Sequence, residues 1–411
     1  MSFRVLHVLD HSLPVLDGYA QRSAGIVTAQ AQIGMQPAVV TSPLHQQDDL
    51  SASDTILDGI RYWRTCIGGG LSKRVILRRW PVFREMAVVR LLRKRIDALL
   101  ESEPFDLIHA HSPALCGIAA WQASRSRNLP FVYEIRSFWE DADLDHDKSL
   151  WKLLRYRLGR NLETFVVRRA DSVVGIAQTV LQDLVERKVH AGKLYHVPNG
   201  VDITRFTPRP RDAALEADLG ENGIPTLGFI GTLFPWEGVA WLVRAVAELH
   251  RTDPHFKLLI VGDGVEAPEV RKAIHQTESA GYISFLGSVP NNQIERYYSV
   301  MDILVYPRRS VRITEMVTPL KPLEAMALGK AVLGSSVGGI RELVESEKTG
   351  ILFEPGNTQD FCRQASRLLK KPDLRRMLGE QARQKVAQEK DWKALARRYE
   401  NVYSAAIRNS R

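Results

Sequence analysis

Lys321 and Glu324 are the residues in this chain best suited to hold a ligand. They lie in the stretch TPLKPLEAMALGKAVLGSSVGG, residues 318–339. Pro322 suits a first helical position and Gly329 suits the residue just past a helix, so the stretch predicts a short helix followed by a strand. The helix dipole favours a carboxylate in a first turn but not a lysine. An anion between Lys321 and the free N–H groups would explain the lysine, so we expect phosphate binding here, with simple capping as the alternative.

His109 and His111 form a second pair that could take part in chemistry. They stand two positions apart in IHAHSP, at the end of a strand-like run, so their side chains share one face of that strand. Open parallel sheets bind ligands at the carboxyl ends of their strands, which is where this pair falls. The competing interpretation is a stacked pair with a structural role.

Gly262, Gly264 and Ala267 in IVGDGVEA match the GxGxxA pattern of dinucleotide-binding turns. The next strand-like run, YISFLGS, ends without the acidic residue that would hold a ribose in such a site. We therefore expect a tight turn between a strand and a helix at this position, and no nicotinamide cofactor.

Alternate aspartates run from Asp141 to Asp147 in WEDADLDHD, a spacing that could suit a metal ion. An EF-hand loop needs glycine at its sixth position and glutamate at its twelfth, and counting from Asp141 these are His146 and Lys152. We expect a solvated acidic loop and no bound metal. No GxSxG, HExxH or P-loop sequence occurs, so hydrolysis by a nucleophile or of a nucleoside triphosphate has little support.

Residues 61–100 carry a concentrated positive charge. The segment holds eleven basic residues against two acidic ones, a net charge of +9 that equals the surplus of the whole chain. A basic amphipathic segment with interleaved aromatic residues fits an anionic membrane surface, and a solvated helix face is the alternative. Nothing in it resembles a nucleic-acid-binding module, so we expect no nucleic acid partner. Trp63, Trp80 and Phe83 stand among its arginines, and we expect Trp80 or Phe83 to insert into the membrane.

Strand-like and helix-like stretches alternate along the whole chain, which is typical of doubly wound parallel sheets. A stretch rich in proline and charge, DITRFTPRPRD, interrupts the pattern, and we expect a linker at about residues 203–222. The sequence thus predicts an α/β protein of two Rossmann-like domains, residues 1–205 and 206–390, facing a cleft at the carboxyl ends of their strands. Residues 391–411 predict a final helix that could return to the N-terminal domain.

Length and composition agree with a two-domain globular protein. The chain has 411 residues, of which 45% are hydrophobic and 25% charged. No apolar run approaches the ~20 residues that a membrane-spanning helix needs, and the N-terminus lacks the apolar core of a signal peptide. Cys66, Cys116 and Cys362 lie far apart, which argues against zinc and disulfides and favours a cytoplasmic protein.

The chain resembles the retaining glycosyltransferases of the B-type fold, the group 1 and family 4 enzymes. The resemblance covers nearly the whole sequence in the family's order and rests on ten stretches. They are LDGYAQRS, DLIHAHSP, VPNGVDITRFTP, GFIGTL, LLIVGDG, ISFLGSVP, DILVYP, KPLEAMALGKAV, SSVGGIRELV and TGILFEPGN. The versions YEIRSFWED and TPLKPLEAMA are similar to those of a branch associated with bacterial exopolysaccharide and O-antigen assembly.

This resemblance implies roles for residues of the C-terminal half. Glu324 would bind the ribose hydroxyls of a nucleotide-sugar, and Lys321 would meet its diphosphate. Most relatives carry another glutamate seven residues before the ribose-binding one; here the counterpart is Glu315, with eight residues between. Relatives also have arginine and lysine in the loop that reads GTLFPWEG here, where Thr232 and Glu237 stand instead. The arginines expected to replace that charge are Arg308, Arg309 and Arg312.

In the N-terminal half, Arg136 of YEIRSFWED stands where relatives have histidine and glycine, and Gly18 would offer backbone N–H groups to the donor. We expect His111, Arg136 and Glu315 to act in catalysis, and Gly18, Arg308, Arg309, Lys321 and Glu324 to bind the donor. Preorganised cations and N–H groups suffice to stabilise a departing diphosphate, so no metal or other cofactor is expected.

The function implied is transfer of a hexose, or a modified one, from a nucleotide diphosphate, with UDP the first choice. The acceptor would be a saccharide or lipid-linked molecule, the configuration would be retained, and the pathway would be polysaccharide biosynthesis. Residues 61–100 would hold the enzyme on the inner face of the plasma membrane. A nucleotide-sugar 2-epimerase on the same fold and a non-catalytic, anion-binding surface protein are the alternatives.

Overall fold

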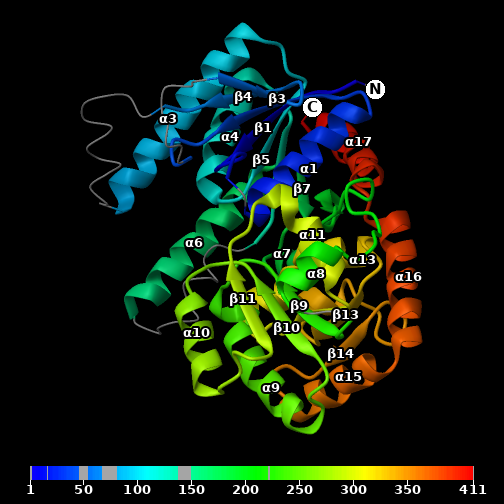
Figure 1. The fold of residues 1–411 in the computed structure, drawn as a ribbon. Helices are drawn as coiled ribbons and strands as arrows, with labels where there is room; N and C mark the ends of the chain where they lie inside the picture. Colours follow the sequence, from blue (N-terminus) through cyan, green and yellow to red (C-terminus); the bar gives the residue numbers. More distant parts are fainter. Residues whose placement is uncertain are drawn as a thin grey trace. The chain divides into compact units, whose positions relative to one another are not determined.

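The structure, a computed structural model, describes residues 2–15, 17–45, 54–66, 81–137, 150–220 and 223–410. The chain divides into two compact units, which are described separately (Figure 1). The first comprises Met1–Pro198 together with Trp392–Arg411, and the second comprises Asn199–Asp391. Each unit is built on one sheet with helices packed against it, the α/β class that the sequence predicts.

The first unit contains an eight-stranded sheet in the order β3-β4-β2-β1-β5-β6-β7-β8. All its neighbouring strands are parallel except β3 and β4, which pair antiparallel at one edge. The sequence analysis did not predict this edge pair, of which β4 overlaps the start of the basic segment. The strands are β1 (Arg4–Leu9), β2 (Gln36–Thr41), β3 (Asp54–Leu57), β4 (Ile60–Arg64), β5 (Leu107–His111), β6 (Phe131–Ile135), β7 (Ser172–Gly175) and β8 (Leu194–His196).

Two groups of helices pack in the first unit. Helix α1 contacts the C-terminal helix α17, whereas α4 contacts both α3 and α6. One apolar cluster joins Val5, Leu107 and Val132 of the sheet to Ile26 of α1 and Leu395 of α17. The helices are α1 (Gly18–Gln32), α3 (Pro81–Ser102), α4 (Ala114–Arg127), α6 (Leu150–Arg169), α7 (Gln178–Glu186) and α17 (Trp392–Asn409), with a 3-10 turn at Ala191–Lys193.

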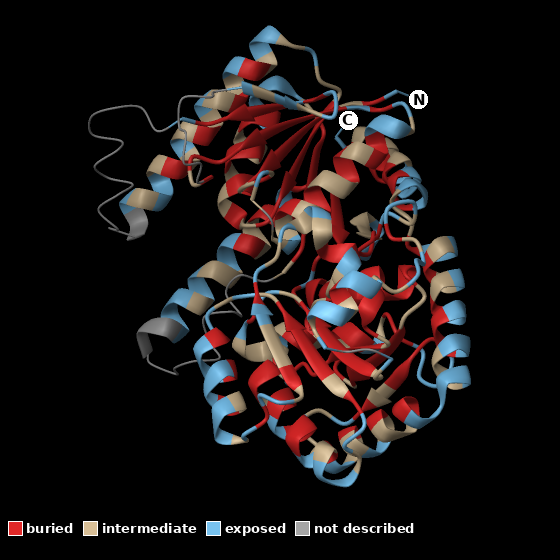
Figure 2. Cartoon of the chain, in the orientation of Figure 1, coloured by how far each residue is buried: buried red, intermediate tan, exposed pale blue. Residues whose placement is uncertain are grey.

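The second unit contains a six-stranded, fully parallel sheet in the order β11-β10-β9-β12-β13-β14. Its strands are mainly apolar, as expected for a sheet covered on both faces. Figure 2 shows these strands largely buried, with exposure concentrated on the outer sides of the helices. The strands are β9 (Thr226–Ile230), β10 (Lys257–Val261), β11 (Ile283–Gly287), β12 (Ile303–Tyr306), β13 (Ala331–Ser335) and β14 (Ile351–Phe353).

Two apolar clusters show how helices cover this second sheet. One includes residues of α9, α10 and α15, and the other includes residues of α11, α13 and α16. The helices are α8 (Ala213–Asp218), α9 (Val239–Thr252), α10 (Ala267–Gln276), α11 (Ile294–Val300), α12 (Arg312–Met316), α13 (Lys321–Ala327), α14 (Gly338–Arg341), α15 (Thr358–Lys370) and α16 (Pro372–Glu389), with 3-10 turns at Pro235–Glu237 and Asn291–Gln293.

The units divide at positions that differ slightly from those expected. The division falls after Pro198 rather than after residue 205, and the C-terminal segment of the first unit begins at Trp392. The stretch 203–222, expected as a linker, belongs to the second unit, where Phe206 and Leu215 are buried in its core. Proline and charge suggested an exposed connection, but two apolar side chains are enough to attach the stretch to a core.

Candidate functional site

Helix α13 begins where the sequence predicts, and it brings Lys321 and Glu324 together. The Nζ atom of Lys321 lies 3.0 Å from each carboxylate oxygen of Glu324. The hydroxyl of Tyr298 donates to Glu324 Oε2 at 3.0 Å. Glu324 is 5% exposed. Its carboxylate is held in place by the hydrogen bonds from Lys321 and Tyr298. A fixed carboxylate beside an ammonium group can accept hydrogen bonds from sugar hydroxyls while the cation meets a phosphate.

Asn199 positions the loop that leads into α13, and the sequence analysis assigned it no role. Its amide Nδ2 donates to the Thr318 carbonyl at 2.6 Å and lies 3.1 Å from the Thr318 hydroxyl. Tyr306, the last residue of β12, donates from its hydroxyl to the Lys321 carbonyl at 2.9 Å. Both contacts anchor the start of α13. The signal that could have pointed to Asn199 was its place in VPNGVDITRFTP, one of the stretches that carry the family resemblance.

Arg308 and Arg309 follow β12 but have different surroundings. Arg308 is 4% exposed, forms an ion pair with Glu237 at 3.1 Å, and donates to the Val317 carbonyl. Its charge is thus compensated by the glutamate that stands where relatives are basic. Arg309 is exposed, and its backbone N–H donates to the Trp236 carbonyl at 2.9 Å. The side chain of Arg309 is therefore the better placed of the two to meet a ligand.

Glu315 is engaged in contacts with its own chain. Its Oε2 accepts from the backbone N–H of Gly338, the first residue of α14, at 2.7 Å and from Arg341 at 3.2 Å. Its Oε1 accepts from Ser310 at 2.7 Å. These contacts fit a structural role that ties α12 to the start of α14. The catalytic role expected for Glu315 would require it to leave these partners.

Gly262 and Gly264 have a structural explanation. Both have positive φ angles, 142° and 157°, in the turn after β10. A Cβ atom would lie 1.8 Å from the Gly231 carbonyl oxygen at the first position and 2.4 Å from that of Leu233 at the second. The pattern thus reflects the close approach of two loops, and only glycine fits both positions.

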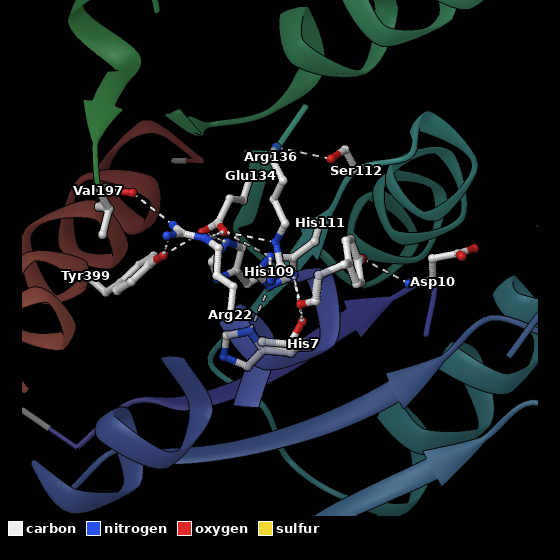
Figure 3. A network of polar contacts seen from close by, with 12 residues as sticks. His7, Asp10, Arg22, His109, His111, Ser112, Glu134, Arg136, Val197 and Tyr399 are labelled. Atoms are coloured by element: carbon white, nitrogen blue, oxygen red, sulfur yellow. Dashed lines mark hydrogen bonds and ion pairs between the residues drawn. The ribbon is translucent and has the colours of Figure 1, made fainter. Parts of the chain in front are cut away.

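A buried polar network lies in the first unit on the sheet face covered by α1 and α17 (Figure 3). It contains His7 of β1, His109 and His111 of β5, and Glu134 of β6. Arg136, the first residue after β6, also belongs to it. Strand alternation places these side chains on the same face as Val5, Leu107 and Val132, which belong to the cluster with α17. The network therefore replaces the apolar core at the carboxyl end of this face.

Glu134 is the anionic centre of this network. It is fully buried, and its Oε1 lies 3.0 Å from Arg22 Nε and 3.3 Å from Arg136 Nε. The hydroxyl of Tyr399 of α17 donates to Oε2 at 2.5 Å. Burial raises the pKa of Glu134, but the neighbouring cations Arg22 and Arg136 outweigh it and hold the pKa well below its usual range. The C-terminal helix α17 thus contributes a side chain to the network around Glu134 of β6, although the two elements are far apart in the sequence.

The histidines are neutral, and their hydrogen bonds define their tautomers. Burial is the main cause that lowers the pKa of His7 to about 4 and that of His111 to about 3. Arg136 Nη2 donates to His111 Nδ1 at 2.8 Å, so His111 carries its proton on Nε2 and donates to His7 Nδ1 at 3.0 Å. His7 Nε2 then donates to the side-chain amide oxygen Oε1 of Gln30 at 2.9 Å. Both nitrogens of His111 are used, so His111 positions Arg136 rather than acting as a free base.

The start of α1 joins this network through Arg136. Gly18 is the first residue of α1, and Asp17 caps the helix by accepting from the Ala20 N–H at 2.8 Å. Arg136 Nη1 donates to the Tyr19 carbonyl at 2.6 Å, and the guanidinium lies 4.2 Å from the centre of the Tyr19 ring. The structure therefore brings Gly18, His111 and Arg136 together, although Arg136 is only 5% exposed.

A cationic histidine stands beside this helix start. His11 lies 2.7 Å from Asp17 and 3.1 Å from Asp10. Burial lowers its pKa, but the two carboxylates outweigh that effect and raise it to about 9. Sequence reasoning missed His11, and also Arg22, Glu134 and Tyr399 of the network. The available signal was the position of His11 just after a strand end.

His7, His109 and His111 are also close enough to one another to hold a metal ion. However, His7 and His111 share a hydrogen bond, and two arginines, Arg22 and Arg136, surround the group. Added positive charge is unfavourable there, so the arrangement suits a hydrogen-bonded relay better. The acidic run Asp141–Asp147 lies outside the described residues.

The basic segment is only partly described, since residues 67–80, with Trp80, lie outside the described ranges. Within the described part, three arginines form ion pairs and Arg64 is 6% exposed. Trp63 is 4% exposed in β4 and is therefore not available to a membrane, whereas Phe83 is 59% exposed. Trp63 belongs to a strand of the sheet, which the basic composition of the segment hid. The three pairs are Arg61–Glu103, Arg93–Asp97 and Arg95–Asp54.

Comparisons with known proteins match both units to glycosyltransferase family models. Residues 26–205 match the family model described as Glycosyltransferase Family 4, and residues 224–371 match the one described as Glycosyl transferases group 1. The chain is 26% identical over 358 residues to GDP-mannose-dependent alpha-mannosyltransferase of Mycolicibacterium smegmatis, which covers 85% of this chain and 84% of that protein.

Two solved structures show the same fold. Sucrose-phosphate synthase from Thermosynechococcus elongatus has a TM-score of 0.79 at 21% identity, covering 98% of each chain. An Anabaena protein solved in complex with UDP-glucose has a TM-score of 0.71 at 19% identity, covering 97% of this chain and 99% of that one.

Proposed function

Because the chain belongs to the group 1 and family 4 glycosyltransferases, a family of retaining, nucleotide-sugar-dependent enzymes with the B-type fold, we propose that it transfers a hexose from UDP to a saccharide or lipid-linked acceptor. The observation that carries the donor side is the Lys321–Glu324 pair at the start of α13, with Tyr298 behind it. A 2-epimerase and a non-catalytic anion-binding protein, the alternatives from sequence, do not agree with this membership.

In this proposal the second unit binds the nucleotide. Glu324 accepts hydrogen bonds from the two ribose hydroxyls, and Lys321 turns from Glu324 to the diphosphate. Arg309, which is exposed and carries no carboxylate contact at hydrogen-bonding distance among the described residues, adds charge as the bond to the sugar breaks. Fixed cations stabilise a developing negative charge most strongly where water is excluded. Attack on the face from which the diphosphate leaves would retain the configuration.

In the first unit, the network around Glu134 holds Arg136 rigid beside Gly18. Arg136 has five N–H donors, and its hydrogen bonds to the described residues use Nε, both hydrogens of Nη1 and one of Nη2. The remaining Nη2 hydrogen is the group that could reach a substrate oxygen. We assign Arg136 this single donating role and assign His111 to its positioning.

The donor is tested with a thermal-shift screen of UDP-, GDP- and ADP-sugars. GDP is the main rival base, since the mannosyltransferase relative is named for GDP-mannose. A ligand at 100 times its dissociation constant stabilises the folded protein by about 2.7 kcal/mol, which such a screen resolves. Transfer of labelled sugar to a polysaccharide-type or lipid-linked acceptor then tests the reaction. No shift with any nucleotide-sugar would contradict the proposal.

We also propose that the reaction needs no divalent metal, because cationic side chains are available on the donor side. Activity is expected to persist in EDTA and to be unchanged by added manganese or magnesium. Loss of activity in EDTA with recovery in manganese would contradict this proposal and direct attention to the acidic run or the histidine group.

We propose further that the enzyme works in polysaccharide assembly on the cytoplasmic face of a membrane, attached through anionic lipid. No helix among the described residues is long and apolar enough to cross a membrane. The support comes from helices α3 and α6. Of the twelve exposed large apolar side chains in the described part of the chain, six lie there. They are Phe83, Met86, Leu153, Leu154, Leu158 and Leu162.

Helix α6 has the composition of a helix that lies on a lipid surface. Leu154, Leu158 and Leu162 recur every four residues, which places them along one side of the helix. Residues 150–169 contain six basic residues and one acidic residue, Glu163, which is buried. An apolar stripe among arginines binds an anionic membrane by partial burial and by charge. We therefore propose that α6 binds the membrane together with α3, which belongs to the basic segment 61–100.

A further inference from the structure

Arg64, the last residue of β4, is a buried cation with no carboxylate partner among the described residues. It is 6% exposed. Its two Nη atoms donate to the Ser12 hydroxyl and the Leu13 carbonyl, while its Nε has no hydrogen-bond partner. Burial lowers the pKa of Arg64, and the Tyr62 phenol opposes this effect. Buried charges in proteins are normally paired, so Arg64 has an unmet need for an anion.

Two further polar groups beside Arg64 also have no partner. Thr41 is the register partner of Arg64 on the neighbouring strand β2, it is fully buried, and its Oγ1 has no hydrogen-bond partner. Two positions earlier, Val39 and Tyr62 are also register partners and pack in one apolar cluster. Alternation therefore places Thr41 and Arg64 on that same face of the sheet.

His45 is the third member of this group. It is 7% exposed, and its Nδ1 accepts a long hydrogen bond from the Ser12 N–H at 3.4 Å, the residue that also contacts Arg64. Burial, followed by the charges of Arg64 and His11, lowers the pKa of His45 to about 4, so the ring is neutral. Its proton is then on Nε2, which has no partner. Thr41, His45 and Arg64, together the Arg64 cluster, thus offer unused hydrogen-bond donors.

We propose that the Arg64 cluster binds an anionic group of the acceptor, a phosphate or a carboxylate. The cluster lies at the carboxyl ends of β2 and β4 and beside the loop after β1, the edge at which open parallel sheets bind ligands. The unpartnered Nε of Arg64, the Thr41 hydroxyl and the His45 Nε2 are three donors that suit the several acceptor oxygens of an oxyanion. A neutral sugar hydroxyl could satisfy the donors but would leave the buried charge uncompensated. The assignment of this anion to the acceptor rests on the proposed transferase function.

The test measures anion binding separately from donor binding. The wild-type chain is saturated with the nucleoside diphosphate that the donor screen identifies, so that phosphate cannot enter the donor side. Inorganic phosphate and glucuronate are then titrated in separate arms, with the melting temperature as the readout. We expect a saturable rise with at least one probe, and the more effective probe tells a phosphate-bearing acceptor from a carboxylate-bearing one. The absence of any saturable rise would overturn the proposal.

The variants locate the site. Arg64→Gln is expected to weaken binding of the effective probe at least tenfold. Thr41→Val keeps the side-chain shape and removes a hydroxyl that makes no bond in the protein, so it is expected to fold normally and weaken binding severalfold. Arg61→Gln is the matched control, since Arg61 lies on the same strand, is half-exposed, and pairs with Glu103. It should bind as the wild type does.

The outcomes separate this proposal from the proposed function. Unchanged probe affinity in both Arg64→Gln and Thr41→Val would show that the charge of Arg64 is compensated within the chain, and would overturn the site. If Arg64→Gln does not fold, Thr41→Val decides. Failure of every nucleotide to bind would contradict the donor assignment while leaving the anion titration informative. Nucleotide affinity is expected to stay the same in all three variants, because the donor residues belong to the second unit.

Discussion

Glu324 is the residue on which the donor assignment depends most directly. Replacing it by alanine removes the acceptor for two ribose hydroxyls, so nucleoside diphosphate binding should weaken by roughly 1.5–3 kcal/mol, the range for hydrogen bonds to a charged group. Isothermal titration with UDP or GDP measures the change. Tyr298→Phe is the matched control, because it removes one contact to the same carboxylate without removing the carboxylate. Wild-type affinity in Glu324→Ala would reduce Glu324 to a residue that only stabilises its helix.

Arg308 and Arg309 should now respond differently, although the sequence assigned them one role. Arg309→Ala is expected to lower turnover more than affinity for the nucleotide-sugar, because the charge it meets grows in the transition state. Arg308→Ala should mainly lower stability, since it leaves Glu237, which is largely buried, without its cation. Steady-state kinetics and thermal denaturation of both variants check this. Equal kinetic effects at wild-type stability would restore the shared role.

The double change Arg308→Met with Glu237→Met supplies the control for that pair. It removes the cation and the carboxylate together, so little stability should be lost if the two residues serve mainly each other. A large loss of turnover in this double variant would mean that Arg308 also meets the donor.

At the scale of the element, α6 should decide membrane binding. Leu158→Ser replaces an exposed side chain in the middle of the leucine stripe, so folding should be unaffected while flotation with anionic vesicles falls severalfold. Arg157→Glu with Arg160→Glu should remove the salt-sensitive part of the binding, at about 1 kcal/mol for each charge near the surface. The measurement is co-flotation at low and high salt.

Val185→Ser on α7 is the control for α6, because Val185 is 50% exposed on another helix of the same unit. It should float as the wild type does. Equal recovery of the wild type with neutral and anionic vesicles would leave α6 without a role for charge. Capture by protein in place of lipid would identify the stripe as a protein-binding surface.

At the scale of the whole molecule, the buried histidines should make the protein sensitive to mild acid. His7 and His111 have pKa values of about 4 and about 3 in the folded state, against a usual value of 6.5. Above pH 6.5 these two histidines are neutral in the folded and the unfolded state. Between pH 6.5 and 5 they take up protons only in the unfolded state. The free energy of unfolding should therefore fall as the pH drops from 6.5 to 5, by up to about 1.4 kcal/mol per pH unit for each histidine.

Denaturant unfolding at pH 7.5, 6 and 5 measures this slope. His7→Gln should be less stable at pH 7.5 but should show a shallower dependence, because one proton uptake is lost. A wild-type stability that is constant between pH 6.5 and 5 would contradict neutral histidines in the folded state. Burial raises the pKa of Glu266 to about 7, so this carboxyl takes up a proton in the folded state within the same window and offsets at most one histidine. The window stops at pH 5 so that carboxylates with a low pKa, such as Glu134, contribute little.

Much of the architecture follows from the sequence alone. Alternation of buried strands and amphipathic helices predicted two doubly wound α/β units, because parallel strands need crossover helices and their apolar runs need cover on both faces. Local chemistry placed the helix start at Lys321, where proline and glycine restrict the backbone. Each of these features depends on residues close together in the chain.

The structure alone decided which charges are free. Lys321 and Glu324 were recognised because they stand three residues apart on one helix turn, whereas Arg308 and Glu237 meet only across two loops. Arg64 looked like one more exposed cation until β4 placed it inside the sheet edge. Glu134 is completed by Tyr399, 265 positions later. A sequence pattern reports periodicity within a segment, but the burial and pairing of a charge depend on which distant segments pack around it.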